Sequence, residues 1–336
     1  MRPGLRLSIL LAVLAASVSA YYFCNGRRPP APPRAQTTTA RNPARPPQVG
    51  LPASATNPAP TAMTTAPVPK DKISKAVATI LGLDPEQKDY RSRSKAMHRL
   101  TRQLSAADVT ALRQFLEARA DNQNDMNPLA FNGLKNDVLD ILLRQLQIPD
   151  GLGRDLVSMY RNASHDDMWR DYCVQYMGAC YEAIQPTGVA TNEPDLTRAE
   201  IARSYWDAIA KKDKTIAGTS LIALEQLSRN HPELERKKVG ETALTFATDE
   251  GCSEAARITA LRVCGTMGRT EVLPAARVAA QAGDSVSLQA AAIATIGDLG
   301  EPQDAELLSS MAGSREPRIQ KVAEAACARL AARNRK

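Results

Sequence analysis

The residues with the most obvious chemical potential are four in a row, Ser164 to Asp167, which bring a hydroxyl, an imidazole and two carboxylates together. Neighbours in sequence do not form a catalytic triad, because its members must converge in space. Most metal sites also need more ligands than His165 with one or two aspartates. We therefore expect a helix N-terminus here, with Ser164 as N-cap, Asp167 completing a capping box and Asp166 complementing the helix dipole. The alternative is a hydrolase or metal-dependent enzyme with a site near His165, between the two helical domains.

A second candidate is an aromatic segment, since seven of the fourteen aromatic residues lie between Tyr160 and Trp206. Within it, apolar side chains recur at steps of three and four, as they do along one stripe of one helix. The stripe comprises Trp169, Tyr172, Cys173, Tyr176, Met177, Cys180 and Ile184. We interpret it as the core of an amino-terminal helical domain. An aromatic pocket for a peptide or a sugar is the alternative, because tyrosine hydroxyls need partners when buried.

Six cysteines in 336 residues are too few for a disulfide scaffold. Cys173 and Cys180 share a helix face but lie about 10 Å apart at ~1.5 Å per residue, and a disulfide needs Cα atoms within roughly 7 Å. In an oxidising compartment one disulfide could form, and Cys252–Cys264 is the pair that we expect first. Gly151-Leu-Gly153 lacks the Lys-Ser/Thr of a phosphate loop and follows no strand, so we expect no nucleotide there.

The elements that carry these residues are predicted to be helices from Asp71 onward. No alternating β-branched run is bounded by turn residues, so no strand is expected. Capping boxes predict helix starts at Ser105–Asp108 and Thr197–Glu200, and Asn127-Pro128 predicts another. Pro149-Asp-Gly151 ends that helix. Its expected core stripe comprises Leu134, Val138, Leu139, Ile141, Leu142 and Leu146. The expected fold class is all-α.

The carboxyl-terminal part contains an internal repeat. Ala260–Gly268 and Ala292–Gly300 share a pattern of small and apolar residues, 32 positions apart. Shorter copies are Ala223–Ser228 upstream and Ala325–Leu330 downstream, and a proline follows the last glycine of both full copies. A period of about 30 to 40 residues built from two helices is typical of a solenoid. Such a helix pair cannot bury its apolar face alone, so neighbouring pairs must stack.

These residues resemble the HEAT-repeat family, and within it the short bacterial type named after phycobilisome lyases, over roughly Thr215 to Arg333. That type often has Ala-Ala-x-x-Leu-Gly-x-Leu-Gly-x-Pro, and residues 291–302 follow this pattern. Arg257 and Arg318 match the arginine that opens the first helix of such repeats, whereas the second copy has Leu288 there, so a full ladder of Asp–Arg pairs is not expected. The resemblance implies a binding scaffold. A few members work with bilin lyases, but no feature here indicates bilin chemistry.

The amino terminus predicts export. Arg2 and Arg6 form a positive region, residues 7–16 are apolar, and Val18-Ser19-Ala20 forms a cleavage site after Ala20, which gives a signal peptide over residues 1–20. The alternative is an uncleaved membrane anchor over residues 5–24, because about 20 residues span a bilayer. The protein is therefore expected to be periplasmic, secreted or anchored.

A spacer follows the export signal, since residues 21–70 hold twelve of the 22 prolines and show no apolar periodicity. Such a segment cannot offset its ordering entropy by burial, so we expect an extended linker. A proline-rich ligand for a recognition module is the alternative. The expected organisation after the linker is an α-helical domain over residues 71–190 and a HEAT-like repeat domain over residues 191–336.

The net charge of +7 is concentrated in residues 1–70, which hold eight cations and no acid. The remaining chain has 35 basic and 36 acidic residues, so it lacks the cationic footprint of a nucleic-acid binder. The basic runs at 211–214 and 236–238 are interpreted as solvated helix faces. Alternatively, the linker contacts an anionic surface through its arginines, Arg27, Arg28, Arg34, Arg41 and Arg45.

The sequence therefore predicts an exported, non-enzymatic protein-binding scaffold with no catalytic residue, cofactor or metal site. The second helix of each repeat is expected to form a concave face for the partner. The candidate partner-binding residues are Lys238, Glu241 and Thr245 on one such helix and Arg277 and Gln281 on the next. Their mixed charge favours a protein partner over a nucleic acid.

Overall fold

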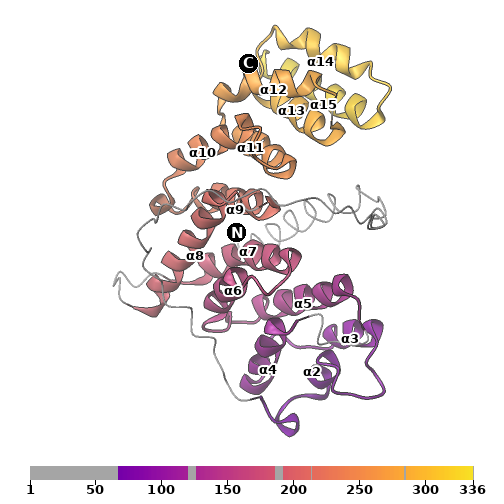
Figure 1. The fold of residues 1–336 in the computed structure, drawn as a ribbon, viewed down its shortest axis with the longest axis vertical. Helices are drawn as coiled ribbons and strands as arrows, with labels where there is room; N and C mark the ends of the chain where they lie inside the picture. Colours follow the sequence, from indigo (N-terminus) through magenta and orange to yellow (C-terminus); the bar gives the residue numbers. More distant parts are fainter. Residues whose placement is uncertain (1–66, 120–125, 186–191, 213, 284, 336) are drawn as a thin grey trace, which may run out of the picture. The chain divides into compact units, whose positions relative to one another are not determined.

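The computed structural model of the protein describes residues 67–119, 126–185, 192–212, 214–283 and 285–335. These residues form α-helices and short 3-10 turns and contain no strand, which confirms the predicted all-α fold (Figure 1). The α-helices are α2 (Lys75–Ile80), α3 (Tyr90–Met97), α4 (Ala106–Glu117), α5 (Pro128–Leu143), α6 (Leu152–Arg161), α7 (Asp167–Ala183), α8 (Glu193–Ala210), α9 (Lys214–Leu227), α10 (Arg236–Thr248), α11 (Glu254–Met267), α12 (Leu273–Gln281), α13 (Val286–Leu299), α14 (Asp304–Ala312) and α15 (Pro317–Arg333).

The predicted signal peptide over residues 1–20, the alternative anchor over residues 5–24 and nearly all of the linker over residues 21–70 lie outside the described residues. Within the described part of the chain, every helix is too short or too polar to cross a membrane.

Alternate helices form two rows, called row A and row B here. Row A contains the odd-numbered helices, and from α3 onward each packs against the next as far as α15. Row B contains the even-numbered helices, and each of them packs mainly against the row A helix that follows it in the chain. Stacked helix pairs of this kind are the architecture of an α-solenoid. The stacking also continues across residue 190, because α7 packs against α9 and α6 against α8.

Small residues allow the row A helices to approach one another closely. A β-carbon added to Gly297 on α13 would lie 2.6 Å from the β-carbon of Ala326 on α15. One added to Gly218 on α9 would lie 3.1 Å from the hydroxyl oxygen of Thr259 on α11. The alanine and glycine pattern of the repeat is therefore a packing requirement, since these contacts leave no room for larger side chains.

The observed helix starts confirm two of the predicted caps and correct a third. Ser105 and Asn127 each accept a hydrogen bond from the backbone amide three residues on, at 3.1 and 2.8 Å. The predicted capping box at Thr197–Glu200 is wrong, because α8 already begins at Glu193. The Thr197 hydroxyl instead donates to the carbonyl of Glu193 within the helix at 2.9 Å. A proline in the first turn of α8 favours the earlier start.

The predicted aromatic stripe lies on α7 and belongs to the core. Its buried members are Trp169, Cys173, Tyr176, Met177 and Cys180. The predicted stripe of α5 is confirmed by four buried residues, Leu134, Val138, Leu139 and Leu142. Leu146, however, is 73% exposed. The helix ends at Leu143, so Leu146 lies in the connector and does not continue the stripe.

The predicted Cys252–Cys264 bridge is wrong, since both residues are free thiols in the structure. Cys252 precedes α11, whereas Cys264 is buried near the other end of that helix. Ten helical residues at ~1.5 Å each place the two about 15 Å apart along the axis, beyond the reach of a disulfide. Cys173 and Cys180 are also free, as their spacing predicts.

Candidate partner-binding surface

All five predicted partner-binding residues lie in row B. Lys238, Glu241 and Thr245 are exposed on α10, and Arg277 and Gln281 lie on α12. The two helices pack separately, α10 against α11 and α12 against α13, and have few contacts with each other. The structure therefore places the two sets on one row without joining them in one groove.

Arg277 is engaged inside the repeat stack. Its Nε donates to Oδ1 of Asp304 at 2.7 Å and its Nη2 to Oδ2 at 2.9 Å, and Nη2 also donates to Glu301 at 3.0 Å. Asp304, at the start of α14, is 3% exposed. The hydrogen bonds from Arg277 hold the pKa of that carboxyl below its usual range. Bidentate pairs of this kind are strong, so Arg277 serves to join α12 to α14.

The Asp–Arg pairs that join neighbouring helices do not use the arginines singled out by the family resemblance. Besides Arg277, Arg329 on α15 contacts Asp298 on α13 at 2.7 Å. Arg318 is exposed. The buried Nε of Arg257 has no hydrogen-bond acceptor among the described residues. The Asp–Arg pairs between neighbouring helices thus use other arginines, Arg277 and Arg329.

A groove of about 640 Å³ lies between α8 and α10, and is called the α8–α10 groove here. One face of α8 forms its floor, with Asp195, Ala199, Ala202 and Trp206 at helical steps of three and four. The turn before α10 contributes residues 233–235, and α10 itself contributes Lys238. Of the five predicted residues, Lys238 is the one that lines this groove.

Hydrogen bonds from Arg198 hold the walls of the α8–α10 groove in place. Its guanidinium is buried 4.0 Å from the ring centroid of Tyr181. Nη1 donates to the carbonyls of Tyr181 and Ile184, both at 3.0 Å, and Nη2 donates to Oε1 of Glu233 at 2.7 Å. These bonds satisfy carbonyls at the C-terminal end of α7, which the helix leaves unpaired. Arg198 therefore ties α7, α8 and the turn before α10 together.

The same network sets the charges around the groove. The Tyr181 hydroxyl donates to Oε1 of Glu233 at 2.9 Å. Burial, followed by this bond to a carboxylate, raises the pKa of Tyr181 to about 12. Burial alone would raise the pKa of Glu233, but bonds from its own amide, Tyr181 and Arg198 hold it below its usual range. At neutral pH the tyrosine is therefore neutral and the glutamate charged.

Trp206 is the feature of the groove that sequence analysis did not identify. The Nζ of Lys238 lies 4.6 Å from the Trp206 ring centroid and 3.7 Å from Oε1 of Glu235. Glu235, the residue before α10, has a left-handed backbone conformation with φ of 48°. The sequence offers no clear signal for it, because two adjacent helical residues can both be buried, as Val138 and Leu139 are on α5. In the structure Tyr205 is fully buried and Trp206 is half-buried in the groove.

The residues of the alternative catalytic site do not converge. The Ser164 hydroxyl donates to Oδ1 of Asn162 at 2.7 Å. Asp166 is the N-cap of α7, because its Oδ1 accepts a bond from the Trp169 amide at 3.0 Å. The predicted cap at Ser164 is therefore wrong. Among the described residues no hydrogen bond joins the imidazole of His165 to Ser164 or Asp166, and His165 does not line the α8–α10 groove.

His165 instead belongs to a buried cluster around Lys135. Burial, together with the nearby charges of Lys135 and Arg119, lowers the pKa of His165 to about 4. Lys135 is 1% exposed, donates to the carbonyl of Ala118 at 2.9 Å and lies 3.8 Å from the Trp169 ring centroid. Burial lowers the pKa of Lys135 to about 7. In the described part of the chain no group of three or more His, Cys, Asp or Glu side chains is placed to hold a metal.

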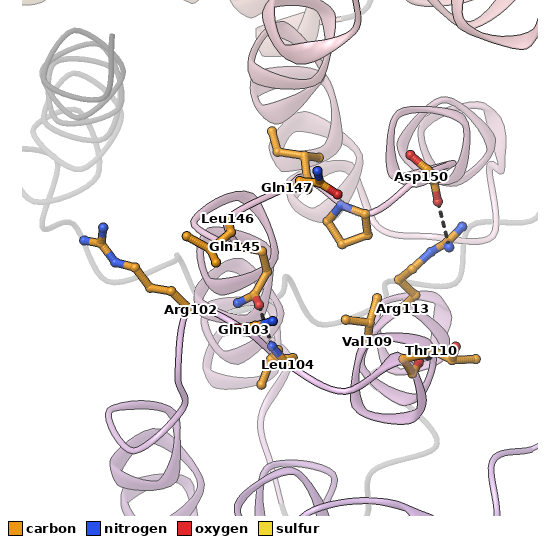
Figure 2. A pocket seen from close by; sticks show the side chains of 13 residues that line it. Arg102, Gln103, Leu104, Val109, Thr110, Arg113, Gln145, Leu146, Gln147 and Asp150 are labelled. Carbon is orange, nitrogen blue, oxygen red and sulfur yellow. Dashed lines mark hydrogen bonds between the residues drawn. The ribbon is translucent and has the colours of Figure 1, made fainter. Parts of the chain in front are cut away.

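A second groove, of about 710 Å³, lies between α4 and the chain that joins α5 to α6 (Figure 2). It is called the connector groove here, and its lining comes from residues 102–113 and 145–150. The backbone amide of Leu104 donates to the Gln145 side chain at 2.9 Å, across the start of the groove.

Comparison with known proteins supports the repeat assignment. A sequence profile of HEAT repeats matches residues 242–328. Among solved structures, human deoxyhypusine hydroxylase in complex with glycerol aligns at 16% identity over 76% of this chain and 95% of its own, with a TM-score of 0.27. That likeness is too low to support an argument on fold or activity. No curated protein matches the chain. Residues 242–328, from α10 to α15, are therefore HEAT repeats, within the wider span predicted from the sequence.

Proposed function

We propose that this protein is an exported, non-enzymatic scaffold that binds a segment of a partner protein in the α8–α10 groove. The observation that carries the proposal is the half-buried Trp206 beside Lys238 in a groove held open by the Arg198 network. Tryptophan at a preformed concave site is typical of an interface hot spot. A groove that is already ordered also binds its partner at a smaller cost in conformational entropy.

The chemistry of the groove favours a peptide segment as its occupant. Ala199, Ala202 and the half-buried Trp206 provide apolar surface. Carboxylates and Lys238 provide charges of both signs, which can pair with the mixed side chains of a protein. The carboxylates also repel the phosphates of a polyanion. A nucleic acid would require clustered cations, and the lining carries three acids, at positions 195, 233 and 235.

Export is supported by the first 20 residues, with their paired arginines, apolar run and small-residue cleavage site. The proline-rich residues 21–70 support a spacer role, which would hold the helical repeats away from a membrane or cell surface. Sequencing the amino terminus of the mature protein tests this part. A terminus at Tyr21 indicates a cleaved signal, an intact amino terminus in the membrane fraction indicates an anchor, and an uncleaved cytoplasmic protein contradicts export.

The binding proposal is tested by placing a photo-crosslinking amino acid at Ala199, on the exposed floor of the groove, in the native cell. We expect a discrete crosslinked partner that disappears in Trp206→Ala and in Lys238→Glu. The matched control is Lys237→Glu, which makes the same charge change one residue away on a side chain that is 88% exposed. A crosslink that is equally strong in all variants would contradict the assignment of the groove.

A further inference from the structure

We propose that the connector groove is a second docking site, which takes an extended peptide segment carrying an apolar side chain close to a carboxylate. This site is separate from the α8–α10 groove, and its residues come from α4 and the connector between α5 and α6. The protein would then link two partners.

The apolar part of the argument begins with Leu146, which is 73% exposed at one end of the groove (Figure 2). Leu104, Val109 and Ile148 line the same groove and are each half-buried. A single exposed leucine is common on protein surfaces, but Leu146 borders a concave apolar lining. An aliphatic side chain of a peptide could therefore cover Leu146 and fill the groove beside it.

Hydrogen bonds hold the two walls in place before any partner arrives. The Gln145 side chain accepts from the Leu104 amide at 2.9 Å and donates to the carbonyl of Ile141 at 3.1 Å. The amide of Leu146 donates to the carbonyl of Arg102 at 3.0 Å. Leu146 is thus fixed in its exposed position by its own backbone, so the groove is preorganised.

The charges of the groove favour an acidic partner. Arg102 is exposed at the same end as Leu146, and the described residues provide it with no ion pair. Arg113 lies at the other end, where its Nε pairs with Asp155 and its Nη1 donates to the carbonyl of Asp150. Asp150 is the one carboxylate residue in the lining. Because Asp155 already pairs with Arg113, Arg102 is the cation of the lining that is left for a carboxylate of the partner, and arginine binds carboxylates in a bidentate manner.

Two amide side chains complete the match to a peptide. Gln103 and Gln147 line the groove and are exposed. A primary amide both donates and accepts, so it can pair with the backbone N–H and C=O of an extended chain. The lining therefore supplies what a short extended peptide needs, namely an apolar wall, backbone partners and a cation.

The test is selection of a display library of random peptides, about twelve residues long, on the immobilised full chain. We expect selected peptides in which an apolar residue lies within a few positions of Asp or Glu. Their binding should weaken at least tenfold with Leu146→Ser and with Arg102→Glu, and should persist with Trp206→Ala. Because Leu146 and Arg102 are exposed, both variants should keep the wild-type melting temperature, which serves as the control for folding.

The failure of this proposal is distinguishable from failure of the proposed function. Peptides that lose binding only with Trp206→Ala occupy the α8–α10 groove, which overturns the second site and supports the first. An absence of peptides that depend on Leu146, or Leu146-dependent peptides that are basic rather than acidic, would also overturn it.

Discussion

Replacement of the buried Lys135 by methionine should change how the stability of the protein depends on pH. Lys135 lies within the core at 1% exposure, where its ammonium contacts the Trp169 ring and the carbonyl of Ala118. Methionine has a similar length and no charge, so Lys135→Met removes the titrating group with little change in volume.

The sign follows from the two pKa values of this amine. In the unfolded chain the pKa of Lys135 has its ordinary value of 10.5, whereas burial lowers it to about 7 in the folded state. Between these values the unfolded state binds more protons, so the free energy of unfolding rises with pH. Each pKa unit corresponds to about 1.36 kcal/mol, so the full rise is about 3–5 kcal/mol, where the lower value allows for relaxation of the site. Below pH ~7 both states are protonated and the gain is absent.

Urea denaturation of the wild type and of Lys135→Met at several values from about pH 6 to pH 10.5 measures this effect. The difference between the two proteins cancels the titration of all other groups. We expect Lys135→Met to be more stable near pH 6, by less than the full titration energy because the Ala118 carbonyl loses its donor. The wild type should then gain on the variant steadily between pH ~7 and pH ~10. Parallel stability curves would refute the claim that this amine is buried and loses its proton near pH 7.

Three further perturbations test the packing of the repeats and the role of His165. Arg277→Ala leaves the buried Asp304 carboxylate without its cation, and because the Arg277 side chain is 32% exposed we expect a loss of about 2 kcal/mol in urea denaturation, below the ~3–5 kcal/mol of fully buried pairs. Gly297→Ala should destabilise the protein by about 1–3 kcal/mol through overpacking of α13 against α15. The control is Gly265→Ala, where an added β-carbon would lie 3.6 Å from its nearest neighbour, and this variant should be neutral or more stable by up to ~1 kcal/mol. Equal changes in the stability of both variants would contradict the close approach of α13 and α15. With a pKa of about 4, His165 should keep the ring NMR shifts of a neutral imidazole from about pH 5.5 to pH 8, and protonation of the ring with a midpoint near 6.5 would contradict its burial.

The helical class and the repeats were predictable because their signals are local. Ser105 and Asn127 cap helices as their side chains predict, and the small residues of 291–302 match a close packing requirement. The repeats upstream of α10 were harder to recognise in the sequence, because the number of residues between successive row A helices varies there. Row A helices α13 and α15 begin at Val286 and Pro317, near the repeat period, whereas α7 and α9 begin at Asp167 and Lys214.

The surroundings of the predicted site residues depend on contacts between residues distant in sequence. Arg277 was a candidate for partner binding because it lies on a second helix, but Asp304, on another helix, engages it. Ser164 has the sequence form of an N-cap, yet Asp166 offers the same cap two residues later and is also bonded by Asn132 from α5 at 2.9 Å. Trp206 was not singled out within the aromatic segment, and its position in the groove depends on how α8 packs to bury Tyr205.

The affinity of the captured partner for purified wild-type protein, Lys238→Glu and Lys237→Glu would test the role of the α8–α10 groove most sharply. If the partner occupies the groove, Lys238→Glu should weaken binding at least tenfold, because that ammonium lies over Trp206 inside it, while Lys237→Glu should bind as the wild type does. Equal affinities for all three proteins would show that the partner binds elsewhere.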